Sequence, residues 1–346
     1  AILQSTPLSV DNLEVVIIDD RSTDDTLAIA QTLQQQLNDP RLKILAGQAR
    51  PANQYWAGKN WACAEAVQVT TGEFLLFIDA DVRLKPGAIE TAIETVQTEK
   101  IDLLTCMPAL VCECFAEWLV QPIMFNHLAV CFDFTAVNDP TTDSAFAAGP
   151  FMLFRRSAYE KIGGHESVAS EIVEDVELAR RIKRAGLKLG LYAASNLAFV
   201  RMYRSWSALW EGWTKNLYLG AHRSWGLMVY MAAIMLFLYP IPWLALAILL
   251  AKGELAKVIT ITNYQLPITN YQLPVTLLTI CLAIIVIWQQ YNLRRLGAQI
   301  SDCSTKYWWL GGLGGTLVAA IAIASAIKTE TGWGWTWRGR ALQIKS

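Results

Sequence analysis

The chain has 346 residues, of which 53% are hydrophobic and 10% aromatic, and its 29 Lys and Arg residues nearly balance 30 Asp and Glu residues. This balance excludes a chain-wide nucleic-acid binder and an acidic tail, because both require an excess of one charge. A mean hydropathy of +0.29 is high for a soluble protein and low for a pure transporter. We therefore expect a mixed architecture without a nucleic-acid partner.

The first half of the sequence alternates strand and helix patterns. The run LEVVII at residues 13–18 is apolar and ends in two aspartates, which is typical of a buried parallel strand. Ser22 or Thr23 is a suitable cap for the helix that follows. Further strands are expected at residues 42–46, 74–78, near 102–106 and 151–154, and further helices at 61–69, 86–98 and about 172–185. The alternation predicts an α/β fold, in which ligands bind at the carboxyl ends of the strands.

The last third of the sequence indicates a membrane region. Residues 203–225 place three tryptophans among basic residues, as in an amphipathic helix at a membrane interface. Apolar stretches follow at 226–251, 273–288 and 308–326, long enough for two to three spans. The motif ITNYQLP occurs twice in tandem, at 261–267 and 268–274, and indicates a loop insertion without chemistry of its own.

Basic residues before the first span and between the last two place the α/β domain in the cytosol by the positive-inside tendency. A third crossing would leave Lys328, Arg338 and Arg340 on the opposite side, so a re-entrant or interfacial segment is the alternative. We expect an integral protein of a bacterial inner membrane with a cytoplasmic catalytic domain. Its expected parts are a domain at 1–200, an interfacial segment at 201–225, a membrane region at 226–327 and a tail at 328–346.

Seven cysteines are scattered through apolar segments, and the close pair Cys112 and Cys114 has no second pair at the spacing of a zinc site. We expect reduced, buried thiols.

Three acidic clusters are candidates for chemistry. Asp79 and Asp81 follow the strand FLLFI, where alternate residues reach one site and offer hard oxygen ligands for Mg²⁺ or Mn²⁺. A bare pair of this kind is common, and a solvated loop is its ordinary interpretation. Asp19 and Asp20 also suit helix capping, and Glu174 and Asp175 also suit the dipole of a helix that starts beside them.

The joint order of the motifs is more specific. LEVVIIDDRSTDDT, FLLFIDADV, AAGPFMLFRRSAYEKIGG and VEDVELARRIKRAG together resemble family 2 glycosyltransferases of the GT-A fold, over about residues 13–188. The segment LWEGWTKN is similar to what carotenoid- and hopanoid-associated membrane members of the family carry before their spans. The resemblance implies inverting transfer from a nucleotide-diphosphate sugar, with a UDP-sugar favoured. Membrane anchoring and the aromatic segment next to the site favour a lipid hydroxyl as the acceptor, such as that of a carotenoid or another isoprenoid. A cell-surface polysaccharide as acceptor stays open.

The resemblance also implies roles for individual residues. Asp20, with Asp19 beside it, would contact the nucleotide, Asp79 the ribose or the metal, and Asp81 the metal, which neutralises the diphosphate. Asp175 would be the general base, with Glu174 beside it. The matching segment GKNWACAEA places Lys59 near the nucleotide, with a surface lysine as the alternative. Trp213 and Lys215 would line the acceptor or leaving-group site, although interfacial anchoring explains them equally.

The sequence departs from the family pattern in two respects. The Gln-x-x-Arg-Trp motif of the processive synthases does not occur, which favours transfer of a single sugar. Only AILQSTPLSVDN precedes LEVVII, so the family's opening strand is missing. We expect that the true start lies upstream, with another membrane anchor, or that the chain as given does not bind the donor normally. His127, His165 and His222 are too dispersed to predict a histidine site; His165, in the GGHE loop, is expected to have no special role, with a phosphate or metal contact as the alternative.

Two other interpretations stay open. FLLFIDADV also fits a haloacid dehalogenase-like phosphatase, but the order of the other acidic pairs does not. A non-catalytic membrane scaffold with a degenerate transferase domain is the second.

Overall fold

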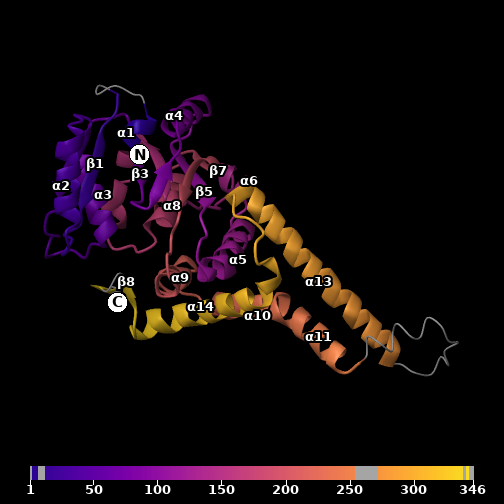
Figure 1. Ribbon diagram of the computed structural model, residues 1–346. Helices are drawn as coiled ribbons and strands as arrows, with labels where there is room; N and C mark the ends of the chain where they lie inside the picture. The colour runs from indigo at the N-terminus through magenta and orange to yellow at the C-terminus, as the bar shows by residue number, and fades with distance from the viewer. Residues whose placement is uncertain (1, 7–11, 254–271, 338–339, 343–346) are drawn as a thin grey trace. The chain divides into compact units, whose positions relative to one another are not determined.

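The computed structural model describes residues 2–6, 12–253, 272–337 and 340–342. The chain forms two compact units (Figure 1), one of residues 1–111, 129–202 and 343–346 and the other of residues 112–128 and 203–342. The first is the predicted α/β domain, and the second contains the apolar helices. Most of the tandem ITNYQLP repeat lies outside the described residues.

The α/β unit contains seven strands with short helices between them. The strands are β1 Val15–Asp19, β2 Leu42–Ala46, β3 Phe74–Ile78, β4 Val82–Leu84, β5 Leu103–Leu110, β6 Phe151–Arg155 and β7 Leu189–Val200. The helices are α1 Ile2–Ser5, α2 Thr26–Leu37, α3 Gly58–Gln68, α4 Ala88–Thr98, α6 Phe134–Asn138, α7 Arg156–Lys161, the 3₁₀ helix η1 Gly164–Val168 and α8 Glu174–Arg184. The α/β fold class is thereby confirmed.

The strands form a mixed arrangement. A five-stranded sheet has the order β3-β6-β5-β7-β4, and β1 and β2 form a separate parallel pair. Within the larger sheet only β5 and β7 pair in parallel, whereas β6 runs antiparallel to both β3 and β5. Acidic residues nevertheless follow β1 and β3 as the sequence predicts. The prediction that a strand precedes β1 stays a prediction.

Two local expectations were wrong. The strand of LEVVII is not buried, since Ile17 is 45% exposed, and among the described strands β1 pairs with β2 alone. The next helix does not begin at Ser22 or Thr23: α2 begins at Thr26, and the backbone N–H of Ser22 instead donates to Asp19 Oδ2 at 3.0 Å. Asp19 thus closes a turn between β1 and α2.

The core of this unit lies around β5 and β6. Both strands are apolar runs of almost wholly buried residues, and Leu104, Phe151 and Leu153 pack with side chains of α4 and β7. Each such aliphatic or aromatic side chain contributes about 1.5–3 kcal/mol on burial. This rigid centre fixes the strand ends from which the site is built.

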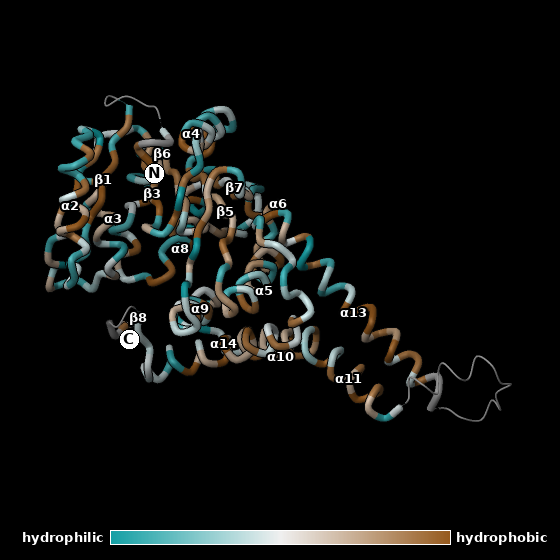
Figure 2. The backbone as a smooth tube through the Cα atoms, viewed as in Figure 1, coloured by the Kyte–Doolittle hydropathy of each residue, from teal (hydrophilic) through white to brown (hydrophobic). Residues whose placement is uncertain are grey.

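The second unit is almost wholly helical. Its elements are α5 Phe115–Cys131, α9 Trp206–Gly220, α10 Trp225–Leu238, α11 Pro240–Ala251, α13 Gln272–Ser301, η2 Trp308–Leu310, α14 Gly311–Thr331 and the short strands β8 Thr336–Trp337 and β9 Arg340–Ala341. Among the residues that the structure describes, three helical segments, at 225–251, 275–301 and 308–331, are long and apolar enough to cross a membrane. Their hydropathy is visible in Figure 2 as brown runs along α10, α11, α13 and α14.

The helix α9 is less simply interfacial than predicted. Trp206 is 41% exposed, but Trp213 is buried and its indole N–H donates to Gln121 Oε1 of α5 at 2.6 Å. Trp213 therefore joins two helices of the unit, because its ring faces α5 and not the surroundings.

Candidate active site

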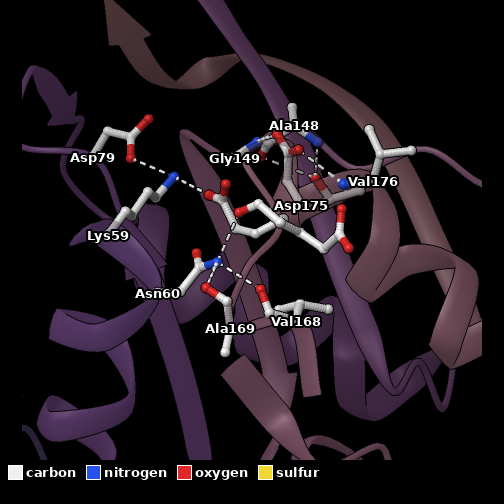
Figure 3. A network of polar contacts seen from close by, with 12 residues as sticks. Lys59, Asn60, Asp79, Ala148, Gly149, Val168, Ala169, Asp175 and Val176 are labelled. Atoms are coloured by element: carbon white, nitrogen blue, oxygen red, sulfur yellow. Dashed lines mark hydrogen bonds and ion pairs between the residues drawn. The ribbon is translucent and has the colours of Figure 1, made fainter. Parts of the chain in front are cut away.

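A lysine connects two of the predicted acidic clusters. The Nζ atom of Lys59, at the start of α3, lies 2.8 Å from Asp79 Oδ1 and 2.7 Å from Glu174 Oε1 (Figure 3). Asp79 follows β3 and Glu174 opens α8, so three elements distant in sequence meet at one ammonium group. Burial by itself would lower the pKa of Lys59, but Glu174, Asp79 and Asp175 together raise it well above its usual value. Lys59 is therefore a permanent cation.

Asp175 is held by backbone donors beside this lysine. Its Oδ2 accepts the N–H of Gly149 at 2.9 Å and its Oδ1 accepts the N–H of Val176 at 2.8 Å (Figure 3). Burial, and then the charge of Glu174, raises the pKa of Asp175 to about 6. The carboxylate is thus a stronger base than an ordinary aspartate and is still mostly ionised at pH 7.

The backbone at Gly149 passes unusually close to these groups. A Cβ atom there would lie 2.9 Å from Asp175 Oδ2 and 3.1 Å from Lys59 Nζ. The preceding residue is fixed by β5, because the N–H of Ala148 donates to the buried Thr105 Oγ1 at 2.8 Å. The core strand therefore sets the position of the N–H group that orients Asp175.

The first acidic cluster forms a neighbouring group. Asp20 pairs with Arg50 at 2.9 Å, and a Cβ on Gly58, the first residue of α3, would collide with the Asp20 carboxylate. Asp20 therefore lies at the amino end of the helix that carries Lys59, where the helix dipole favours an anion. The structure brings Asp20, Lys59, Asp79, Glu174 and Asp175 into the same region of the α/β unit.

Two supporting residues gave little sign of their roles in the sequence. Asn60 is fully buried, and its side-chain N–H groups donate to the carbonyl oxygens of Val168, Ala169 and Glu171, just before α8. It ties α3 to the segment that delivers Glu174. Its position directly after Lys59 and before the apolar residues Trp61 and Ala62 was the only signal.

His165 is a residue of the 3₁₀ helix η1 and lies in the interior of the α/β unit. It is fully buried, its Nδ1 lies 2.9 Å from the Tyr159 hydroxyl, and its Nε2 has no hydrogen-bond partner among the described residues. Burial lowers its pKa to about 4, so the ring is neutral at pH 7. Its packing against Phe77, with ring centroids 4.7 Å apart, explains it as a support of β3. A contact with phosphate or metal stays a prediction.

The carboxylates available for a metal are few. Across the part of the chain that the structure describes, no group of three or more His, Cys, Asp and Glu residues is placed to hold an ion. Asp79 and Asp81 offer two carboxylates, and Mg²⁺ sites commonly combine one or two carboxylates with water and substrate phosphates. The donor set therefore fits a metal that a diphosphate completes, with Asp79 also paired to Lys59.

Trp213 and Lys215 belong to the helical unit. Trp213 is buried, which favours a packing role, and the Nζ of Lys215 lies 4.3 Å from the centre of the Trp337 ring. Their roles at an acceptor or leaving-group site stay predictions.

Comparison with known proteins identifies the family to which the α/β domain is related. Residues 2–163 match the family described as Glycosyl transferase family 2, so the chain contains a family 2 glycosyltransferase domain. The predicted family is confirmed, and the phosphatase interpretation loses its support.

Two curated relatives illustrate the similarity. The 4,4'-diaponeurosporenoate glycosyltransferase of Staphylococcus aureus (strain MRSA252) is 29% identical over 232 residues, which cover 66% of this chain and 58% of the relative. The enzyme of the same name from Staphylococcus haemolyticus (strain JCSC1435) is 28% identical over 220 residues, covering 60% of this chain and 54% of the relative. The chain thus matches little more than half the length of these relatives.

Solved structures are more distant. A mannosyltransferase from Pyrobaculum calidifontis in complex with GDP-Man and Mn²⁺ has a TM-score of 0.49 and 15% identity, covering 95% of this chain and 81% of that one. TarS of S. aureus, residues 1–349 with UDP-GlcNAc, has a TM-score of 0.39 and 13% identity, covering 97% of this chain and 87% of that one.

Proposed function

We propose that the chain transfers a sugar from a nucleotide-diphosphate sugar to a membrane lipid, with inversion at the anomeric carbon. The observation that carries the proposal is the Lys59 bridge, which joins the strand-end acid Asp79 to the helix that begins with Glu174 and Asp175. A donor-binding group within the family match at residues 2–163 and a candidate base just beyond that match thereby lie close together. A UDP-sugar is the favoured donor.

In this proposal the donor contacts the two strand ends. Asp20, with Asp19 behind it, binds the nucleoside, and Arg50, 2.9 Å from Asp20, holds that carboxylate in place. Asp79 and Asp81 would hold Mg²⁺ or Mn²⁺, which would neutralise charge on the diphosphate leaving group. Lys59 supplies a further positive charge beside Asp79, where negative charge develops on the departing phosphate.

Asp175 acts on the acceptor. It removes the proton from the acceptor hydroxyl as the oxygen attacks the anomeric carbon, and the bond to the diphosphate breaks on the opposite face. A pKa of about 6 suits this role, because the group is ionised at pH 7 yet more basic than an exposed aspartate. Glu174 positions Lys59 and raises the basicity of Asp175 through its charge.

A lipid acceptor is favoured by the three helical segments that are apolar enough to cross a membrane. The relatives are named for a carotenoid acid, so we infer a carotenoid or another isoprenoid as the acceptor class. Because the relatives are named for an acid, a carboxylate of the acceptor is the second candidate for the group that attacks the anomeric carbon. A carboxylate needs no base at pH 7, so the two acceptor chemistries predict different consequences of removing Asp175.

The test compares lipid extracts of a strain that carries the gene with those of a deletion strain. Loss of a glycosylated pigment or lipid, restored by the wild-type gene but not by Asp175→Asn, is the expected result. Treatment of the product with mild alkali separates the two acceptors, because a glycosyl ester is cleaved and a glycoside of a hydroxyl is not. Loss of a surface polysaccharide in place of a lipid would overturn the acceptor assignment.

A purified full-length chain distinguishes an enzyme from a scaffold. We expect Mn²⁺-dependent binding of one among UDP-, GDP- and TDP-sugars, together with slow hydrolysis of that donor. Absence of both binding and hydrolysis with every donor would contradict the enzyme proposal. We place the catalytic domain on the cytoplasmic side of a bacterial inner membrane, where nucleotide sugars are made.

A further inference from the structure

The helix α14 is attached at both ends to helices that leave the α/β domain. Its 21 residues span about 32 Å, about the thickness of a bilayer core. An upright α14 would therefore place its two ends on opposite sides of a membrane. The contacts of α14 with other helices of its unit indicate whether the helix crosses the membrane in this way.

The amino end of α14 lies on α5. A Cβ on Gly314 would collide with the backbone oxygen of Leu119, and the preceding loop is fixed to the same helix. In that loop the Sγ of Cys303 lies 3.5 Å from that of Cys112, just before α5, and Tyr307 packs on Trp118. The loop of residues 302–310 and the start of α5 therefore lie together.

The carboxyl end of α14 lies on α9. The Ser325 hydroxyl donates to the Thr214 carbonyl at 2.7 Å and accepts the Tyr218 N–H at 3.0 Å. Glu330 pairs with Arg223 at 3.1 Å, just before α10. Beyond the helix, Thr336 donates to Glu211 at 2.5 Å.

The helices α5 and α9 each follow one of two paired strands of the α/β sheet. Strands β5 and β7 are paired with Leu110 opposite Val200, and the chain enters α5 at Phe115 and α9 at Trp206. At about 3.4 Å per residue these connections reach at most about 20 Å from neighbouring strand ends. Both anchors of α14 are therefore on helices that short connections tether to neighbouring strand ends.

The helix α10 runs antiparallel to α14. Its carboxyl end meets the start of α14, because a Cβ on Gly315 would collide with Tyr239, while Arg223 at its other end meets Glu330. Figure 1 shows the two helices side by side within the unit. The chain then turns at Tyr239 and Pro240 into α11, which packs on α13, where Trp243 donates to Gln290 at 3.1 Å.

We propose that α10 and α14 form an antiparallel pair lying along the membrane surface, with only the α11 and α13 hairpin inserted into the bilayer. The partner of this surface is the lipid bilayer: α10 exposes Val229, Tyr230 and Phe237 by 54%, 64% and 66%. In contrast, α14 buries most of its small residues against its neighbours. The 12 residues of α11 cover about 18 Å, less than a full crossing, so the hairpin enters and returns.

This arrangement places the end of α14 on the domain side and removes the conflict that a third crossing creates for Lys328, because that lysine then lies on the side that favours positive charge. Three crossings would make α10 and α14 run in the same direction, from the domain side outward. The two topologies therefore predict different neighbours for Arg223.

Disulfide cross-linking in membranes tests the direction of the pair. The full chain carries serines at Cys112, Cys114, Cys131, Cys281 and Cys303 and a protease site within residues 254–271 that is cut after cross-linking, once detergent has dissolved the membranes, so that only a designed disulfide joins the two fragments. We expect Arg223→Cys with Glu330→Cys to link the fragments efficiently, and Arg223→Cys with Trp309→Cys to leave them separate. The reverse pattern would overturn the proposal, because it is the pattern of three parallel crossings.

Labelling from either face of the membrane gives a second, independent measurement. Trp333 is 79% exposed beyond α14, and Glu94 is an exposed residue of the α/β domain. Trp333→Cys and Glu94→Cys are expected to react with an impermeant maleimide from the same face of sealed vesicles. Labelling from opposite faces would overturn the proposal even if neither cross-link forms.

Discussion

Lys59 and Glu174 form an ion pair of 2.7 Å although they are distant in the sequence, and the Glu174 side chain is only 7% exposed. The same ammonium group reaches Asp79 at 2.8 Å. The lysine therefore compensates two carboxylates, one of them buried. Its removal is expected to affect both the stability of the fold and the geometry of the site.

Lys59→Met removes the charge and keeps the length of the side chain. Glu174 is then buried without its partner, so we expect the free energy of unfolding to fall by about 1–3 kcal/mol. Thermal unfolding in detergent measures the change. The control is Lys43→Met, which breaks the more exposed pair with Glu14 and is expected to cost about 0–1 kcal/mol. Equal effects of the two substitutions would contradict a special role for Lys59.

The activity is expected to have an acid limb near pH 6. Burial and the Glu174 charge raise the pKa of Asp175 to about 6, and a protonated Asp175 accepts no proton from the acceptor. The value of kcat/KM should therefore fall about tenfold for each pH unit below 6. In Glu174→Gln the limb should move to lower pH, because a neighbouring negative charge is lost. A profile that stays flat down to pH 4.5 would exclude Asp175 as the base.

The same shift makes Asp175→Asn a stabilising substitution at neutral pH. The folded state holds the Asp175 proton more tightly than the unfolded chain, so its contribution to stability is complete below pH 4 and is lost as the pH rises to about 6. Asn cannot ionise. We expect the variant to be more stable than the wild type by about 1–3 kcal/mol above pH 6, at about 1.4 kcal/mol for each unit of pKa shift.

Unfolding curves measured at pH 4 and pH 7.5 check this sign. The advantage of the variant should shrink strongly at pH 4, where the wild-type side chain is protonated in the folded state and about half protonated in the unfolded state. An advantage of the same size at both pH values would indicate a packing effect and not the ionisation of Asp175.

Gly149→Ala is expected to lower kcat at least tenfold while the chain still folds. The new Cβ would lie 2.9 Å from Asp175 Oδ2 and 3.1 Å from Lys59 Nζ, so the base and the lysine must both move. Gly220→Ala is the control, because a Cβ there meets nothing within 4 Å. Steady-state kinetics compare the two variants, and equal activity would show that the close approach at Gly149 has no part in catalysis.

The sequence predicted much of the fold and the participants of the site. Apolar runs that end in acids marked β1 and β3, although the two strands belong to different sheets. The order of four motifs then identified the family. The burial of β1 was predicted wrongly, since a composition of Val and Ile does not reveal whether a strand has neighbours on both sides.

The contacts between elements that are distant in the chain could not be predicted from the sequence. The distance between Lys59 and Glu174 depends on how α3 packs against α8, and Asn60 connects carbonyl groups that only the folded chain brings together. The helix α5 was missed because its apolar residues follow no clear one-sided period and Pro122 lies inside it. Local pattern therefore predicts elements well and tertiary pairing poorly.

The most direct test of the central claim compares Asp81→Ala with Asp175→Asn in one experiment, in which donor binding and sugar transfer to a lipid extract are both measured with Mn²⁺. We predict that Asp81→Ala abolishes metal-dependent donor binding. Asp175→Asn should retain binding and lose about 10² or more in turnover if the acceptor is a hydroxyl. Loss of binding to the same extent in both variants, or full turnover by Asp175→Asn with a hydroxyl acceptor, would contradict this account.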